Sequence, residues 1–102
     1  VMGMEGRADY SAAKAGIIAF TRALAKEVAS LGIRVVAISP GAVEGGWFPR
    51  ARPEDREAML QQTRMGRIGK PEDIANLAVF LASEEASYIT GHNFISDGGW
   101  AL

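Results

Sequence analysis

One β-branched run constrains the fold of this chain more than any other segment. Residues 33–38 read Ile-Arg-Val-Val-Ala-Ile and lie between Gly32 and the turn-forming sequence Ser-Pro-Gly at 39–41. A nearly continuous apolar run of this length is typical of a parallel strand covered on both faces, and it should end at Pro40, which has no N–H to donate. The run therefore predicts an α/β fold, in which helices pack on a parallel sheet.

Helices are predicted on both sides of this run along the chain. From Ala8 to Leu31, apolar residues recur every three or four positions, which is the period of an amphipathic helix, and Gly32 follows as a C-terminal stop. Segments 53–63 and 71–83 each begin with Pro, Glu and Asp, which suits the first turn of a helix. A short strand is expected at 94–96. Two strands joined through helices predict a parallel pair with a right-handed crossover.

The length of the chain allows one hydrophobic core and no second domain, because it has 102 residues. Two parallel strands alone do not make a stable sheet, since parallel sheets occur almost only where further strands and helices surround them. The sequence also begins at Val1 and enters patterned sequence almost at once. We therefore expect residues 1–102 to be a single partial domain, excised or truncated from a longer one.

The charge balance excludes several classes of partner. The 11 Lys and Arg residues against 12 Asp and Glu residues give a net charge of −1, so no basic surface for nucleic acid or anionic lipid is expected. The longest uncharged apolar run, 15–20, falls far short of the roughly 20 residues that span a bilayer. We expect a soluble, cytoplasmic protein with no nucleic-acid partner and no membrane partner.

Several side-chain types that build reactive sites are scarce. Cysteine is absent, which excludes disulfides, thiolate metal sites and cysteine nucleophiles, and no metal site is predicted. The single histidine, His92, has no Asp or Ser partner at a recognisable spacing, so we expect it at the surface or in an interface. Asp97 precedes Gly98 and Gly99, which predicts a structural turn with the carboxylate capping backbone N–H groups.

Tyr10 and Lys14 are the strongest candidates for chemistry. They lie four residues apart near the start of the long helix, so both side chains rise from one face a turn apart. A phenol ordinarily has a pKa of about 10, and a proton donor works best near the working pH, so a phenol in that role needs a nearby positive charge. The lysine ammonium supplies one. The alternative is a lysine that lies along an aromatic ring and serves packing alone.

Six segments follow one another in an order and spacing that resemble a known family. They are the Tyr-Ser-Ala-Ala-Lys-Ala-Gly run at 10–16, the strand and turn at 33–41, Gly-Arg-Ile-Gly-Lys-Pro-Glu-Asp-Ile-Ala at 66–75, Phe-Leu-Ala-Ser at 80–83, Tyr-Ile-Thr-Gly at 88–91 and Asp-Gly-Gly at 97–99. Together they resemble the C-terminal part of a short-chain dehydrogenase/reductase, in the bacterial 3-oxoacyl-acyl-carrier-protein reductase and glucose dehydrogenase-like branch.

The resemblance implies a fold and a reaction. The fold would be the C-terminal part of a Rossmann-type doubly wound parallel sheet, with the N-terminal dinucleotide-binding half absent from this chain. The reaction would be hydride transfer between NAD or NADP and a small-molecule carbonyl or secondary alcohol. The choice between the two cofactors depends on a residue that the family places upstream of this chain, as it does its catalytic serine and asparagine.

The resemblance also assigns roles to residues. Tyr10 matches the catalytic tyrosine that exchanges a proton with the substrate oxygen, and Lys14 matches the lysine that favours the phenolate and holds the nicotinamide ribose. Pro40 and Gly41 match the loop under the nicotinamide ring, and the backbone of Val43 matches the position that hydrogen-bonds the carboxamide. The chain departs from the family at Gly45, where a threonine that helps to hold the cofactor is common.

The loop at 41–52 contains two large apolar side chains, Trp47 and Phe48, which correspond to a mobile lid over the substrate in this family. The alternative is that they pack on the helix at 53–63. Four arginines near this lid form a loosely basic patch for an acyl-carrier protein or a phosphorylated substrate, or else a solvated face balanced by Glu and Asp. These arginines are Arg50, Arg52, Arg56 and Arg64.

A stripe of small residues runs along the first helix and favours close packing against another helix. The stripe comprises Ala12, Ala15, Gly16, Ala19 and Ala23. It suits either a subunit interface or burial under more of the same chain. The resemblance implies a homo-oligomer, a dimer or tetramer, assembled through the helix at 10–31, the helix at 71–83 and the final strand. An alternative function is therefore a catalytically inert piece that retains only the oligomerisation helices.

Overall fold

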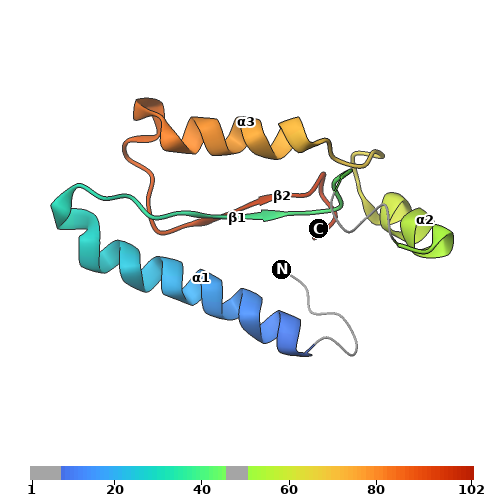
Figure 1. The fold of residues 1–102 in the computed structure, drawn as a ribbon, viewed down its shortest axis with the longest axis horizontal. Helices are drawn as coiled ribbons and strands as arrows, with labels where there is room; N and C mark the ends of the chain where they lie inside the picture. Colours follow the sequence, from blue (N-terminus) through green and yellow to red (C-terminus); the bar gives the residue numbers. More distant parts are fainter. Residues whose placement is uncertain (1–7, 46–50) are drawn as a thin grey trace.

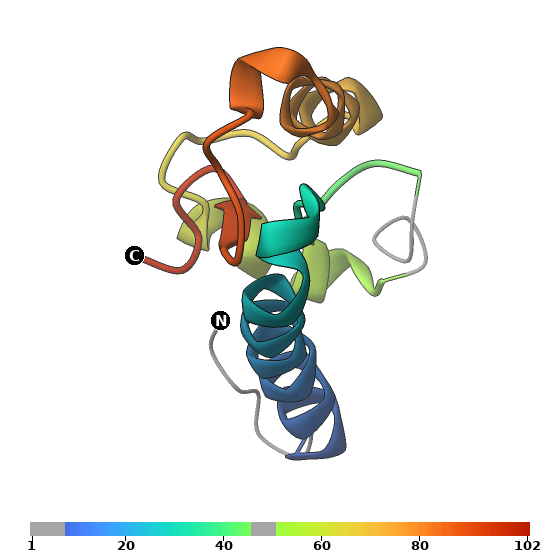
Figure 2. The same ribbon diagram turned by 90° about the vertical axis from the view of Figure 1, so that its left-hand side faces the viewer.

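Two parallel strands lie between two helices in the computed structural model, which describes residues 8–45 and 51–102. β1 (Ala37–Pro40) pairs with β2 (Asn93–Ser96) in parallel, with Ala37 opposite Asn93. Figure 1 shows α1 on one face of this pair and α3 on the other, and Figure 2 shows the same layering from the side. The α/β class, the parallel pairing and the order helix, strand, helix, helix, strand are confirmed.

The helices begin and end close to the predicted positions. They are α1 (Ala8–Val28), continued by the 3-10 turn Ala29–Leu31, then α2 (Pro53–Gln62), α3 (Pro71–Ala82) and the 3-10 turn Glu84–Ala86. Gly32 ends the first helix in the left-handed region, at φ 77°, and donates its backbone N–H to the carbonyl of Ala29. None of the helices within the described ranges is long and apolar enough to cross a membrane.

The first strand is shorter and later than the run at 33–38 predicts. Only the last two residues of that run pair with β2, because the chain that precedes β2 is a turn and a bend. Val35 accepts a hydrogen bond at its carbonyl from the Gly91 N–H (2.7 Å) and donates its own N–H to the Thr90 hydroxyl (2.9 Å). The predicted start of the strand was therefore wrong, although the strand ends at Pro40 as predicted.

Few side chains are completely covered in the part of the chain that the structure describes. The apolar side chains with almost no exposure are those of Ala25, Leu81 and Ala86. Arg34 fixes the end of α3 by donating to the carbonyls of Leu81 (2.7 Å) and Ser83 (3.2 Å). Polar contacts to the backbone of α3 therefore add to a small apolar core.

The turn after β2 packs against the end of β1. The Asp97 carboxylate accepts the backbone N–H groups of Gly99 (2.8 Å) and Ala101 (3.0 Å), which confirms its predicted capping role. Gly98 and Gly99 follow at φ 63° and 87°, where other residues are strained. The turn therefore lies at the carboxyl ends of both strands. These ends form the edge at which parallel α/β sheets bind their ligands.

Candidate functional site

The first half of the site lies on α1. The helix runs antiparallel to β1, so its N-terminal end lies at the same end of the molecule as the carboxyl ends of the strands (Figure 1). Tyr10 and Lys14 project from this end, and the Lys14 ammonium Nζ lies 5.9 Å from the centre of the Tyr10 ring. Tyr10 remains 39% exposed. The predicted pairing of the two side chains is therefore present.

The second half of the site is the loop that leaves β1. Gly41 donates its N–H to the Ser96 carbonyl (3.0 Å), which completes the strand pairing. A Cβ at Gly41 would lie 2.6 Å from the Cβ and 2.8 Å from the Cα of Asp97, so only glycine fits where the end of β1 passes the turn after β2. Gly41 thus has a structural reason to be glycine, independent of any ligand.

Val43 forms an isolated parallel bridge with Gly69. Gly69 donates its N–H to the Ala42 carbonyl (2.9 Å) and accepts the N–H of Glu44 (3.0 Å). In a parallel bridge of this kind the central residue turns its own N–H and C=O to the opposite side. Val43 therefore presents a backbone donor and a backbone acceptor away from Gly69.

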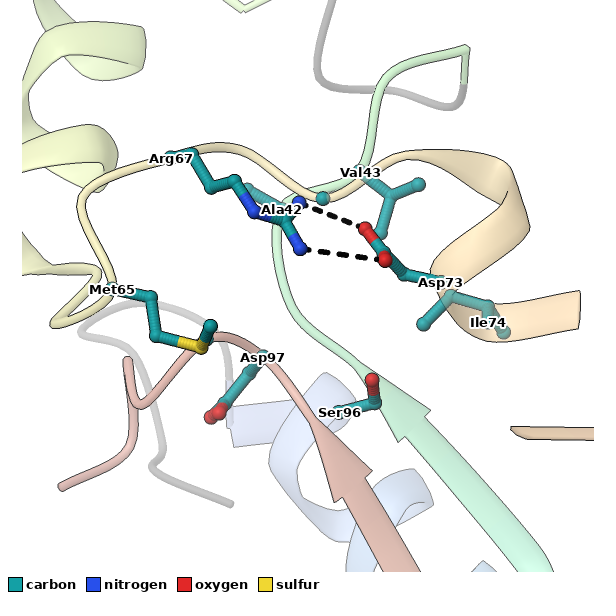
Figure 3. Close-up of a pocket in the computed structure, with 10 residues that line it drawn as sticks. Ala42, Val43, Met65, Arg67, Asp73, Ile74, Ser96 and Asp97 are labelled. Carbon is teal, nitrogen blue, oxygen red and sulfur yellow. Dashed lines mark hydrogen bonds and ion pairs between the residues drawn. The ribbon is translucent and has the colours of Figure 1, made fainter. Parts of the chain in front are cut away.

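A cavity of about 160 Å³ lies beside this bridge, between the loops at the carboxyl ends of the strands. Arg67 and Asp73 lie on one side of it, and Ser96 and Asp97 lie on the other (Figure 3). Met65 also lines it. The cavity is small and its walls are mostly loop residues, so it is a gap between the packed loops and too small for a dinucleotide.

An ion pair closes one side of this cavity. Arg67 donates hydrogen bonds from Nη1 (2.9 Å) and Nη2 (3.4 Å) to the two carboxylate oxygens of Asp73. The same carboxylate accepts a hydrogen bond from the backbone N–H of Lys70 (2.8 Å). The hydrogen bonds from Arg67 and Lys70 lower the pKa of Asp73 from 3.8 to about 2. The same pairing raises the pKa of Arg67. Asp73 is therefore ionised at any physiological pH.

The cavity beside Val43 belongs to only one of the two halves of the predicted site. Tyr10 and Lys14 lie together on α1, whereas Pro40, Gly41 and Val43 lie together after β1, and the cavity beside Val43 is not lined by Tyr10 or Lys14. A second, open hollow lies at the other end of β1, between the segment 34–38 and the last turns of α3. Of the predicted residues within 8–45 and 51–102, those on α1 and those after β1 thus lie at the same end of the sheet (Figure 1).

Further predicted residues lie in the segment that precedes α2. Trp47, Phe48 and Arg50 lie outside the described residues. Gly45 adopts φ 91°, and a Cβ built there would have no neighbouring atom within 4 Å, but a β-branched threonine would be strained in this backbone conformation. The glycine therefore accompanies a loop conformation that the more common residue would not favour.

The arginines that the structure describes are engaged with the chain itself. Arg52 pairs with Glu54 (3.4 Å) and Asp55 (2.9 Å), and Arg56 lies 3.8 Å from Glu44. Arg64 donates to the carbonyls of Gln62 and Leu102. These contacts are those of a solvated face with balanced charge.

His92 is exposed, and its ring meets that of Phe94 edge to face at 6.4 Å. In the segments 8–45 and 51–102, no three His, Asp or Glu side chains gather as metal ligands would.

The cavity beside Val43 is also lined by three residues that the sequence did not indicate as site residues: Arg67, Gly69 and Asp73. All three fall in a segment of family resemblance, and Asp73 was identified only as an acidic residue in the first turn of a helix. An Asp at the third position of a helix commonly reaches back to the N-cap N–H, so this contact had a recognisable signal. The bridge between Gly69 and Val43 joins segments far apart in sequence and had none.

Comparisons with known proteins identify the family of the chain. A model of the enoyl-(acyl carrier protein) reductase family matches residues 1–101. The chain is 47% identical over 98 residues to the 3-oxoacyl-[acyl-carrier-protein] reductase FabG of Vibrio cholerae, and 46% identical over 98 residues to that of Escherichia coli. Each match takes in 96% of this chain and 40% of the relative, so the chain spans about two fifths of the length of these curated relatives.

Two solved structures resemble the chain in both fold and sequence. The TT0495 protein of Thermus thermophilus matches 90% of this chain and 39% of its own, with a TM-score of 0.83 and 45% identity. A 3-oxoacyl-[acyl-carrier protein] reductase of Brucella melitensis matches 93% of this chain and 35% of its own, with a TM-score of 0.88 and 35% identity. Because sequence and fold agree over almost the whole chain, it belongs to the short-chain dehydrogenase/reductase family, and its fold is part of a Rossmann-type α/β domain.

Proposed function

We propose that this chain carries the proton-transfer and nicotinamide-side half of an NAD(P)-dependent oxidoreductase acting on a carbonyl or secondary alcohol. The observation that supports this most is the position of Tyr10 and Lys14 at the edge of the sheet where Val43 presents its backbone. Parallel α/β domains bind their ligands at this edge. The relatives in Vibrio cholerae and Escherichia coli are 3-oxoacyl-[acyl-carrier-protein] reductases, which favours a 3-oxoacyl thioester as the substrate class.

Tyr10 acts as the acid–base group in this proposal. Its hydroxyl gives a proton to the substrate oxygen during reduction and takes it back during oxidation. The Lys14 ammonium, which lies near the same ring, offsets the negative charge that forms on the phenolate and offers N–H donors to ribose hydroxyls. Both side chains sit on one rigid helix, so their separation does not depend on a loop.

In this proposal the loop after β1 receives the nicotinamide. A bound nicotinamide cofactor would supply or accept the hydride at the substrate carbon. The backbone N–H of Val43 would donate to the carboxamide oxygen, and its carbonyl would accept from the carboxamide NH₂, because both groups turn away from Gly69. Pro40 and Gly41 would lie beneath the ring. Neither NAD nor NADP is favoured by these residues.

We further propose that the protein forms a homo-oligomer through α1 and α3. Both helices expose large apolar side chains: Ile17 and Phe20 on α1, and Val79 and Phe80 on α3. Two apolar helix faces on opposite sides of one sheet suit a dimer or a tetramer, in which each face packs on its counterpart in another copy.

The proposal is tested in a chimera in which this chain replaces the matching segment of the Vibrio cholerae reductase. The parent chimera should reduce a 3-oxoacyl thioester, and Tyr10→Phe should lower its turnover about 10²- to 10⁴-fold with cofactor binding retained. Tyr88→Phe is the matched control, because this second tyrosine is fully exposed and lies on the turn before β2. Full turnover in Tyr10→Phe would remove the acid–base assignment.

The same chimera separates the proposal from two alternatives. Reduction of an enoyl thioester in preference to the 3-oxoacyl thioester would assign enoyl reduction, the reaction after which the matching family is named, instead. The other alternative, a catalytically inert oligomerisation module, is favoured by the exposed apolar helix faces. It predicts an oligomeric chimera that folds and neither binds nor uses a nicotinamide cofactor. The 102-residue chain on its own should show no dehydrogenase activity.

A further inference from the structure

The position of Val43 depends on its bridge to Gly69. The pairing of β1 with β2 ends at the bond from the Gly41 N–H to the Ser96 carbonyl. Beyond it, the backbone of Ala42 and Glu44 bonds to Gly69, on the loop between α2 and α3. This loop therefore decides where the donor and acceptor of Val43 point.

Gly69 is itself fixed by one carboxylate. The Asp73 side chain binds residues on both sides of Gly69, namely the guanidinium of Arg67 before it and the backbone N–H of Lys70 after it. Figure 3 shows this ion pair directly beside Ala42 and Val43. The contact is close, since a Cβ at Gly69 would lie 3.3 Å from the Ala42 carbonyl oxygen, 3.4 Å from Val43 Cγ2 and 3.8 Å from Asp73 Oδ2.

We propose that Arg67 and Asp73 are positioning residues that act through Gly69 to hold the Val43 backbone in the orientation that binds the nicotinamide carboxamide. The inference rests on the proposed function. Neither side chain touches the reacting atoms in this assignment. A bidentate guanidinium–carboxylate pair suits the role because its two parallel bonds fix direction as well as distance.

The test compares two ligands that differ only in the nicotinamide half. Dissociation constants are measured in the chimera for NADH and for ADP-ribose, which lacks the nicotinamide, or for NADPH and the 2′-phosphate of ADP-ribose if the parent prefers NADP. Arg67→Ala should weaken binding of the reduced cofactor about tenfold, the effect of one or two lost hydrogen bonds, and leave the nicotinamide-free ligand within about twofold.

Three further variants sharpen the result. Gly69→Ala should act in the same direction, because its Cβ presses on the Ala42 carbonyl and on Val43 without requiring a positive φ. Arg67→Lys should give an intermediate loss, since lysine keeps the charge but not the planar fork. Arg52→Ala is the matched control: its pair with Asp55 has the same distances of 2.9 and 3.4 Å and lies at the start of α2. It should leave the ratio of the two constants unchanged.

Each outcome decides the inference. Equal weakening of both ligands by Arg67→Ala and Gly69→Ala would mean that the pair serves the fold alone, and no weakening of either would mean that Val43 is held without it; both overturn the inference. If Arg67→Ala does not fold, Arg67→Lys and Gly69→Ala carry the same comparison. Failure of the proposed function is seen separately, as a parent chimera that binds the reduced cofactor no better than ADP-ribose or as a Tyr10→Phe variant with full turnover.

Discussion

The loops at the carboxyl ends of the strands and the helix α1 are held in contrasting ways. Short polar contacts lock the loops to one another: the Met65 N–H donates to the Gly98 carbonyl (2.9 Å), and the Trp100 indole donates to the Gln62 side chain (2.9 Å). α1, in contrast, buries only Thr21 and Ala25 among its residues and leaves apolar side chains in solvent.

This contrast separates the two halves of the proposed site. The Val43 half is set by contacts that the described residues make among themselves, so single substitutions there should be felt directly. The half on α1 has its internal geometry fixed by the helix, but the placement of the helix depends on apolar faces that nothing in the described segments covers. The first half should be sensitive to local sterics, and the second to assembly.

The largest expected effect is that of Gly41→Ala in the locked loops. The new Cβ would lie within 2.8 Å of two Asp97 carbons, one of them backbone, so the strand end must move, at a cost of about 3 kcal/mol in the free energy of unfolding. Urea unfolding of the chimera measures the loss. Ser39→Ala, also on β1, removes the bond to the Asn93 side chain on β2 and should cost only about 1 kcal/mol. Equal losses would contradict the close packing inferred at Gly41.

The fold was largely predictable from the sequence because its signals are local. Pro53 and Pro71 mark the first residues of α2 and α3, and Gly32 ends the first helix at a left-handed position that favours glycine. The start of β1 was misplaced because apolar character continues upstream of the pairing. The start of a strand is decided by the strand that pairs with it, and the segment opposite residues 33–36, which precedes β2, does not yet form a strand.

The site was predictable only where its residues share one element. Tyr10 and Lys14 are a turn apart on one helix, so their spacing predicts their proximity. The contact between Val43 and Gly69 joins two loops, and nothing in either segment indicates which residue faces the other. Gly41 was assigned by resemblance to the cofactor loop, whereas the structure adds a packing reason in the backbone of Asp97.

A smaller effect on folding, but a visible one on assembly, is expected for Phe20→Ser on α1. Because this side chain is 65% exposed, its loss should change the free energy of unfolding of one chain by less than about 0.5 kcal/mol. If α1 packs on another copy, the mass in solution should fall, as measured by light scattering on the chimera. Tyr88→Ser, at a fully exposed residue outside α1 and α3, should leave the mass unchanged. An unchanged mass for Phe20→Ser would remove α1 from the interface.

The smallest effect concerns the charge of Asp73, and its signature is its dependence on pH. The folded-state pKa of about 2 lies below the ordinary value of 3.8, so the paired carboxylate contributes stability that is fully present above pH 3.8 and is lost as the pH falls towards 2. The difference in unfolding free energy between the parent chimera and Asp73→Asn should therefore stay constant from pH 7 to about 5 and shrink below about pH 4. Because the pair is exposed to solvent, salt should reduce the same difference at neutral pH. A difference that does not change between about pH 5 and 2 would mean that the Asp73 carboxylate is held by Lys70 and Arg67 no more tightly than in the unfolded chain, and that the locked loops owe their geometry to packing alone.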